Sequence, residues 1–364
     1  MPMRGLGAFL ATGLAGGLGG ALFAVLGLPL PWLLGSLCAV SLLSLTVGAA
    51  PLSRSGLRTG QMTIGLALGL YFTAPVIAGL ARDGHWIVLS AVLTCVLSLL
   101  GAMVFQRLTQ SDATTSLYSA AIGAASDMAQ QAAASGARAE VVALVHSIRV
   151  FIVVGSVPFL ASAWISFAGH PDAAQTGSGL MEALMPTVLG LTETVVLAAV
   201  AVGAAWGFGR LRLPNPWVLG PLAVALAAAV WWLPAARLAP WLVGIGQVLL
   251  GWNLGQRFDR AQLHAFAPAA RAAVVMTLFY GFAGLGLALL VSWGAGLPGV
   301  VAFMATAPGG IAEMAIVAKI LGLDPPTVTV FHAVRMVMMV VFAQTLLLLG
   351  LRLGLLRVGG PPAG

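Results

Sequence analysis

The sequence predicts an all-α integral membrane protein with two homologous repeats, on the order of 10–12 transmembrane helices and two broken helices. Of the 364 residues, 60% are hydrophobic and only 7% are charged. That leaves too few polar side chains to cover a soluble globule of this size. Apolar runs of about 20 residues, the length that a helix needs to cross the hydrocarbon core, recur along the whole chain and favour helices over a barrel.

The apolar runs form two series separated by a polar stretch. The first series comprises residues 6–26, 32–47, 59–80, 86–105, 113–134 and 141–167, and the second comprises 188–206, 217–233, 241–254, 272–293, 300–321 and 328–351. We therefore divide the chain into a first membrane repeat (1–168), a polar linker (169–185) and a second membrane repeat (186–364). The run after Arg4 also resembles a signal peptide, but the run 188–206 occupies the same place in the second repeat and favours a membrane helix.

Four motifs recur in the same order at offsets of 185 or 186 residues. They are Pro31-Trp32-Leu33-Leu34-Gly35 with Pro216-Trp217-Val218-Leu219-Gly220, Gln61 to Gly65 with Gln247 to Gly251, Ala121 to Ala129 with Ala307 to Ala315, and His146-x-x-Arg149 with His332-x-x-Arg335. Such duplication is common in secondary transporters, whose binding site lies between the repeats. Inverted repeats require an odd number of crossings, whereas six runs are counted in each half, so one run re-enters without crossing, the count is wrong, or the repeats are parallel.

Two runs, 113–134 and 300–321, are expected to be broken helices. In the second, Pro308 removes a backbone donor, and Gly309 and Gly310 release the helical geometry. The first contains only Gly123 among alanines, and Ser126 is a candidate cap for the restarting helix. We therefore expect a complete break in the second run and a softer one in the first.

An acid follows each expected break, Asp127 in the first repeat and Glu313 in the second. Both would lie in the first turn of the restarting helix, where the dipole stabilises a negative charge, so each is either a capping carboxylate or a site for a proton or cation. We expect the second copy to carry more of the binding and the first more of the coupling.

Arg149 and Arg335 each lie inside an apolar run, where a guanidinium needs a carboxylate, carbonyl groups or a ligand. Pairing with the acids is one interpretation, and a bidentate clamp on an anionic substrate is the other. His146 and His332 lie one helical turn before each arginine. They are either satisfied interior residues or proton-coupling groups.

The remaining composition excludes several classes of function. The net charge of +7 comes from scattered arginines between the apolar runs, where lipid head groups and topology account for them, and nucleic-acid binding is not expected. We expect no metal or cofactor, because the histidines show no close grouping in the sequence; they are His85, His146, His170, His264 and His332.

The Pro-Trp-x-Leu-Gly blocks, the Ala-Pro-Gly-Gly-Ile-Ala-Glu-Met segment and the two His-x-x-Arg motifs together resemble the AbrB-type membrane protein family, which carries a duplicated membrane domain. The family is often labelled an ammonia monooxygenase or a regulator of gene expression. It is similar to the superfamily of cation/proton antiporters and anion symporters, which implies broken helices that cross at the centre of two inverted repeats. The sequence argues against the monooxygenase label, because a copper site needs clustered histidines.

We therefore expect a secondary transporter that moves a small anion or organic acid, coupled to protons or sodium, and not an enzyme. Its expected partners are the solute, the lipid bilayer of a bacterial-type cytoplasmic (inner) membrane and, as one form of assembly, a second copy. The alternative is a membrane sensor that affects gene expression indirectly.

Overall fold

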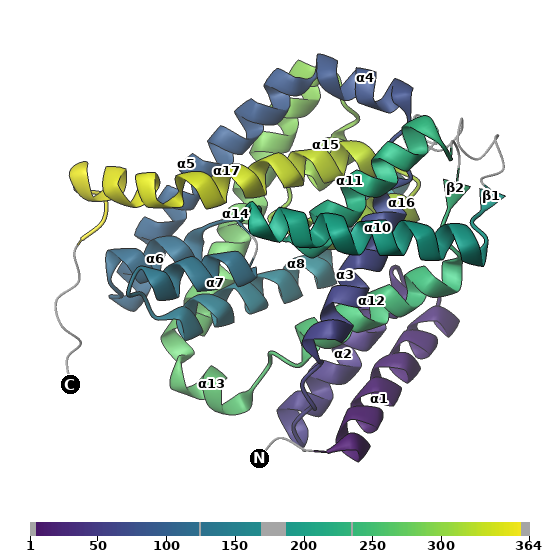
Figure 1. Cartoon of the computed structure of the whole chain (residues 1–364). Helices are drawn as coiled ribbons and strands as arrows, with labels where there is room; N and C mark the ends of the chain where they lie inside the picture. Colours follow the sequence, from purple (N-terminus) through teal and green to yellow (C-terminus); the bar gives the residue numbers. More distant parts are fainter. Residues whose placement is uncertain (1–4, 124, 169–186, 234–235, 358–364) are drawn as a thin grey trace. The chain divides into compact units, whose positions relative to one another are not determined.

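The computed structural model describes residues 5–123, 125–168, 187–233 and 236–357. This part of the chain is almost entirely helical, and its two strands, β1 (Thr187–Val188) and β2 (Ala236–Arg237), pair in parallel over two residues each. The predicted polar linker (169–185) lies entirely outside the described residues. The all-α prediction is confirmed (Figure 1).

Six of the described helices are long and apolar enough to cross a membrane: α1 (Leu6–Val25), α5 (Gly84–Thr109), α8 (Ala139–Ala168), α10 (Leu191–Arg210), α14 (Ala267–Ala295) and α17 (Pro325–Arg352). Shorter helices lie between them: α2 (Pro31–Thr46), α3 (Arg54–Gly69), α4 (Ala74–Arg82), α11 (Pro216–Trp231), α12 (Pro240–Gly255) and α13 (Arg260–Ala265). The prediction of an integral membrane protein is therefore confirmed. The run predicted at 59–80 divides into α3 and the short α4, and the short α13 lies outside every predicted run.

The two expected breaks are present. The first run divides into α6 (Ala113–Ala120) and α7 (Ala125–Ala134), and the second into α15 (Gly299–Thr306) and α16 (Ile311–Ile320). The half-helices have eight and ten residues in both copies, so the first break is as complete as the second although it holds no proline. The expectation of a less complete break in the first run is therefore wrong. The reason is that side chains bind the free backbone groups of the first break, as described in the next subsection.

Local structure follows the duplicated sequence. Helices begin at residues 113, 125 and 139 in the first half and at 299, 311 and 325 in the second, a difference of 186 in each pair. Each Pro-Trp block begins a helix directly after a left-handed residue, Leu30 with φ 50° and Asn215 with φ 45°. Proline at the first helical position has the φ that the helix needs. The orientation of the two repeats stays a prediction.

Contacts divide the chain into two compact units that do not coincide with the sequence repeats. The first unit comprises Met1–Arg82, Val157–Arg260 and Ala312–Thr329, and the second comprises Asp83–Ser156, Ala261–Ile311 and Val330–Gly364. Each unit therefore takes segments from both halves of the sequence. Both breaks fall in the second unit.

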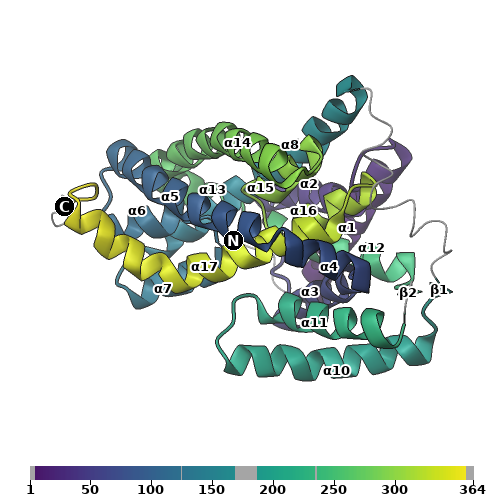
Figure 2. The same cartoon turned by 90° about the horizontal axis from the view of Figure 1, so that it is seen from above.

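In the first unit, α2 packs against α1 and α12, and α3 packs against α11 and α12 (Figure 1). Helix α10 lies beside α11 (Figure 2). Glycines allow the closest of these contacts. A Cβ atom at Gly35 on α2 would clash with the carbonyl group of Gly19 on α1, and one at Gly251 on α12 would clash with the carbonyl oxygen of Leu33. Small residues at helix contacts are typical of membrane proteins, where close backbone approach supplies the packing energy.

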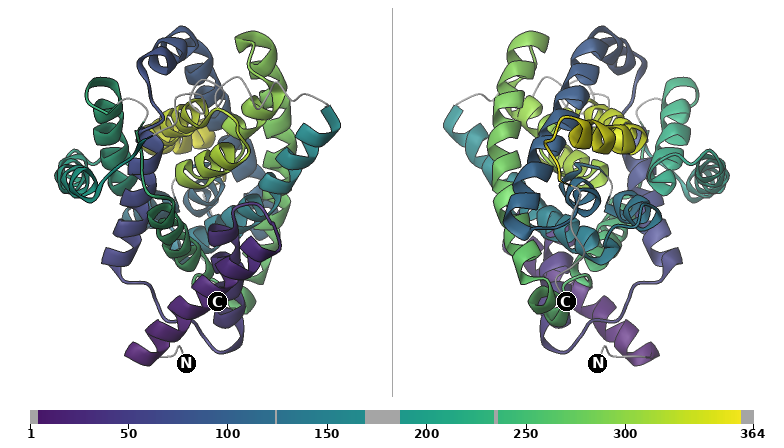
Figure 3. Two further views of the ribbon diagram at one scale, coloured as in Figure 1. Left: turned by 90° about the vertical axis from the view of Figure 1, so that its right-hand side faces the viewer. Right: turned by 90° about the vertical axis from the view of Figure 1, so that its left-hand side faces the viewer.

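In the second unit, α5 packs against α6 and α14, and α14 packs against α15. Helices α5 and α14 are blue and light green in Figure 3. Buried residues of α5, α6, α7, α8 and α17 form one core cluster, which includes Cys95, Tyr118, Met128, Val142 and Met339. Both half-helices of the first break therefore contribute side chains to the core of this unit.

Gly35→Ala is expected to lower the melting temperature in detergent, because the added methyl group must push α1 away from α2. Overpacking of this kind costs about 1–3 kcal/mol. Gly17→Ala is the matched control, since a Cβ atom at Gly17 meets no other atom within 4 Å. Equal melting temperatures for the two variants, measured by differential scanning fluorimetry, would contradict the packing described here.

Candidate functional site

Side chains bind the backbone of the first break on both of its sides. Nη1 of Arg149 donates to the Ala121 carbonyl oxygen at 2.9 Å, and the Tyr280 hydroxyl donates to the Ala120 carbonyl oxygen at 2.7 Å. The backbone N–H of Ile122 donates to Oγ of Ser98 at 3.2 Å. Buried backbone groups need such partners, because each unpaired group costs several kcal/mol in an apolar environment. These bonds explain why this segment breaks without a proline.

His146 is held in one tautomer by its two partners. Its Nδ1 atom lies 3.0 Å from Nη2 of Arg149, and its Nε2 atom lies 2.8 Å from the carbonyl oxygen of Tyr118. An arginine only donates and a carbonyl only accepts, so Nδ1 must be the acceptor and Nε2 must carry the hydrogen. A proton added to Nδ1 would face the guanidinium N–H and break this bond. In this arrangement His146 accepts a hydrogen bond from Arg149 and orients its guanidinium group, and a role in proton coupling stays a prediction.

Arg335 binds the second break in the same way. Its Nη1 atom donates to the Ala307 carbonyl oxygen at 2.8 Å, and its Nη2 atom donates to the Gly309 carbonyl oxygen at 2.7 Å. His332 is buried one turn before it on α17. Of the residues in the break itself, Pro308 is buried and Gly309 and Gly310 are half-buried. Both arginines therefore bind backbone carbonyl groups, which are one of the three kinds of partner expected for a guanidinium group inside an apolar run.

Residues next to each break form a hydrogen bond with α14, and these two bonds lie one helical turn apart. Tyr280 binds the end of α6, and the carbonyl oxygen of Gly284, one turn along α14, accepts a hydrogen bond of 3.1 Å from the Thr306 hydroxyl at the end of α15. Gly101 on α5 leaves room for the Tyr280 hydroxyl, since a Cβ atom there would clash with it. The charges of Arg149 and Arg335 also repel each other. The second unit thus brings together two breaks and two buried cations from opposite halves of the sequence.

Each arginine has one N–H donor that makes no hydrogen bond to the described residues. Arg149 is 3% exposed and Arg335 is 5% exposed, and the Nε atom of each is buried with no hydrogen-bond partner among the described residues. A buried charged donor without an acceptor is costly, so these two N–H groups mark a place where an additional acceptor would be stabilising.

The acids lie where the sequence predicts, in the first turn of the restarting helices. In the second unit, Asp127 is half-buried on α7. Gly123 is half-buried beside Met128, and Ser126 lies in α7, but its side chain falls outside the described part of the structure. These positions agree with a capping role and leave a role in ion binding as a prediction.

In the first unit, Glu313 is half-buried on α16, and the positive charge of Arg257 acts on its carboxylate. Arg257 lies between helices α12 and α13, as the sequence indicates, but its side chain is half-buried and its positive charge acts on an acid, a partner that the sequence did not indicate. Tyr71 occupies the corresponding position of the first repeat, where its ring lies 5.0 Å from Nζ of Lys319. Because the corresponding residue of the first repeat is not charged, comparison of the two repeats does not single out Arg257.

No group of three or more His, Cys, Asp or Glu side chains that could hold a metal ion occurs within the described ranges. The site as described consists of carbonyl groups, two guanidinium groups and neutral donors.

The sequence pattern of a family described as "Transition state regulatory protein AbrB" matches residues 6–349, nearly the whole chain. The chain belongs to the AbrB family. Its resemblance to the AbrB-type membrane proteins is thereby confirmed, and the described helices show that this member of the AbrB family is a multi-pass membrane protein.

Two relatives cover this AbrB-family chain almost completely. The "Uncharacterized protein YhjN" of Bacillus subtilis (strain 168) is 29% identical over 354 residues, which span 88% of each chain. The "Putative regulator AbrB" of Escherichia coli (strain K12) is 24% identical over 321 residues, which span 86% of this chain and 88% of the relative. No solved structure gives a significant match.

His146→Phe is expected to lower the melting temperature, because it removes the acceptor for Arg149 and the donor for the Tyr118 carbonyl group. Leaving buried polar groups unpaired costs about 1–3 kcal/mol each. His146→Gln, whose amide group both accepts and donates, is expected to have a melting temperature between those of the wild type and His146→Phe. The exposed His264 on α13 gives the control His264→Phe. Equal melting temperatures for the two Phe variants would contradict a structural role for His146.

Proposed function

We propose that this AbrB-family protein is a secondary transporter that moves a small anion or organic acid across the cytoplasmic membrane, coupled to protons or sodium. The observation that supports transport is the pair of interrupted helices whose ends lie one turn apart on α14. Irregular backbone at membrane depth is tolerated where it is enclosed by protein or lines a polar cavity, and discontinuous helices of this kind form the solute sites of many transporters.

An anionic solute is supported by the two arginines. They lie close enough to repel each other, and each has a buried Nε–H group without a partner in the described residues. An anion that accepts from both would offset the repulsion and satisfy both donors. Their Nη atoms, fixed on carbonyl groups, would hold the two guanidinium groups ready for it.

Of the two coupling ions, the proton has the better support. Sodium sites in broken helices use unwound carbonyl groups. At these breaks the carbonyl groups of Ala121, Ala307 and Gly309 already accept hydrogen bonds from arginine. Two nearby guanidinium charges also repel a third cation. Asp127 and Glu313 then remain as the candidate proton carriers.

The second candidate is a membrane sensor that binds the same solute without moving it and acts on expression through a partner protein. The names of the family and of the Escherichia coli relative favour it, since both refer to regulation. A solute that binds to purified protein but never crosses the bilayer would support this candidate over transport.

Purified protein in proteoliposomes is expected to accumulate one or more members of a panel of radiolabelled small organic acids when an inward proton gradient is imposed. A sodium gradient alone is expected to drive little uptake, because arginine occupies the carbonyl groups of the breaks. Asp127→Asn and Glu313→Gln are expected to reduce uptake at least tenfold by removing a group that binds protons.

Asp83→Asn is the matched control, since Asp83 lies between α4 and α5 and its side chain makes no capping hydrogen bond. It is expected to retain uptake. Failure of every solute in the panel to move under either gradient would contradict transport. Uptake driven by sodium alone would contradict proton coupling while leaving transport in place.

A further inference from the structure

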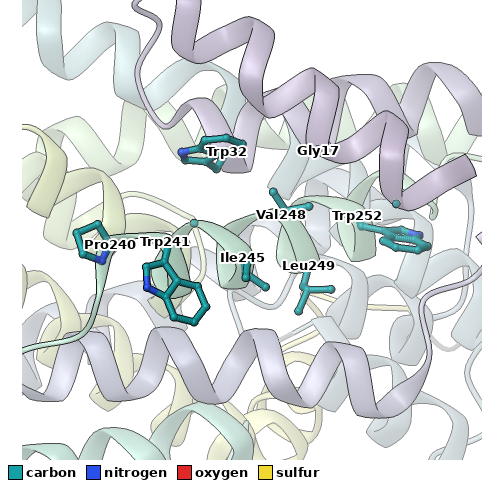
Figure 4. A pocket seen from close by; sticks show the side chains of 10 residues that line it. Gly17, Trp32, Pro240, Trp241, Ile245, Val248, Leu249 and Trp252 are labelled. Atoms are coloured by element: carbon teal, nitrogen blue, oxygen red, sulfur yellow. The ribbon is translucent and has the colours of Figure 1, made fainter. Parts of the chain in front are cut away.

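A groove on the first unit is unrelated to the two breaks. It lies between α1 and α12, beside the start of α2, and has a volume of about 650 Å³. Its lining is apolar except for indole N–H groups: Gly13, Gly17, Trp32, Pro240, Trp241, Gly244, Ile245, Val248, Leu249 and Trp252. Figure 4 shows these side chains along α12, with Trp241 near its start and Trp252 near its end, and Trp32 across from them.

The groove is open because glycines leave space that other residues would fill. A Cβ atom at Gly17 would meet nothing within 4 Å, and one at Gly244 would only touch the ring of Trp32, at 3.6 Å. The Trp252 side chain is held in place, because its indole N–H donates to the Ala50 carbonyl oxygen at 3.0 Å and its ring lies 4.8 Å from that of Phe9. The walls are therefore in place before anything binds.

Exposed tryptophans lie before and at the start of α12, where one end of the groove is formed. Trp231 and Trp232 end α11, Trp241 begins α12, and these three side chains are 80%, 82% and 68% exposed. Tryptophans at exposed positions near helix ends favour the head-group level of a bilayer. Arg237, three residues before α12, is also exposed. We therefore infer that the start of α12 lies at the level of the lipid phosphates and that the groove extends from there toward the hydrocarbon.

The length of the groove fits one leaflet. Trp241 and Trp252 are eleven residues apart, which on a helix is about 16 Å. Half of a hydrocarbon core of about 30 Å is about 15 Å. A chain that enters beside Trp241 would therefore reach Trp252 near the bilayer midplane.

We propose that this groove binds one acyl chain of a phospholipid with an anionic head group, whose phosphate lies near Arg237. Apolar walls without an occupant would lose packing contacts along their length, and an acyl chain restores them. Anionic head groups are attracted to exposed arginines at the interface. A helix of a second copy, about 10 Å across, fits less well, because the exposed Leu14 and Leu18 flank the glycines of α1.

Gly17→Leu tests the proposal, because Gly17 lines the groove and a Cβ atom there meets nothing within 4 Å, so the leucine side chain is expected to occupy the space of the lipid. Gly203→Leu is the matched control: Gly203 lies on α10, 186 residues further along, a Cβ atom there meets nothing within 4 Å, and it does not line the groove. Both variants and the wild type are purified in detergent, supplied with phosphatidylglycerol or phosphatidylcholine, and weighed by native mass spectrometry. Ile245→Trp, which fills the groove from α12, serves if Gly17→Leu does not fold.

Wild type and Gly203→Leu are expected to retain one phosphatidylglycerol at least tenfold better than Gly17→Leu does. Arg237→Gln is expected to remove the preference for phosphatidylglycerol over phosphatidylcholine. Equal retention by Gly17→Leu and Gly203→Leu would overturn the proposal. Conversion of a dimer to a monomer by Gly17→Leu, with lipid retention unchanged, would also overturn it and assign the groove to a second copy. None of these outcomes depends on transport.

Discussion

The bonds between two buried arginines and the carbonyl groups of two interrupted helices are the constraint on which the second unit depends. A helix that stops in an apolar environment leaves its last carbonyl groups without partners, at a cost of several kcal/mol each. Arg149 and Arg335 meet this need with charged donors, which make hydrogen bonds about twice as strong as neutral ones. They also place positive charge at the negative ends of the half-helices α6 and α15.

Other features of the second unit follow from these bonds. A buried guanidinium must be oriented, and neutral His146 does this for Arg149 through its Nδ1 atom. Tyr280 takes the next carbonyl group of the first break, and Gly101 on α5 leaves the space for its hydroxyl. The same helix α14 meets the second break through Gly284. One helix therefore aligns both breaks, and the two arginines come close enough to repel each other, which is an arrangement suited to an anion.

Much of the fold could be predicted from the sequence, because the signals are local. Composition and the length of the apolar runs indicate membrane helices, and Pro308-Gly309-Gly310 indicates a break. The partners of the charged residues could not be predicted, because they depend on which carbonyl groups and side chains meet in space. The sequence left carboxylates, carbonyl groups and a ligand open as partners of the two arginines, and their Nη atoms bind backbone carbonyl groups. Arg257 was missed because the first repeat has Tyr71 at the corresponding position.

The most direct test of the arginine account is hydrogen–deuterium exchange at the breaks, followed by mass spectrometry. Lysine retains the charge but lacks the planar set of donors, so Arg149→Lys is predicted to speed exchange in peptides from residues 113–134 and to leave 299–320 unchanged. Arg335→Lys is predicted to do the reverse. Exchange in both peptides that matches the wild type in both variants would contradict the claim that these arginines hold the breaks.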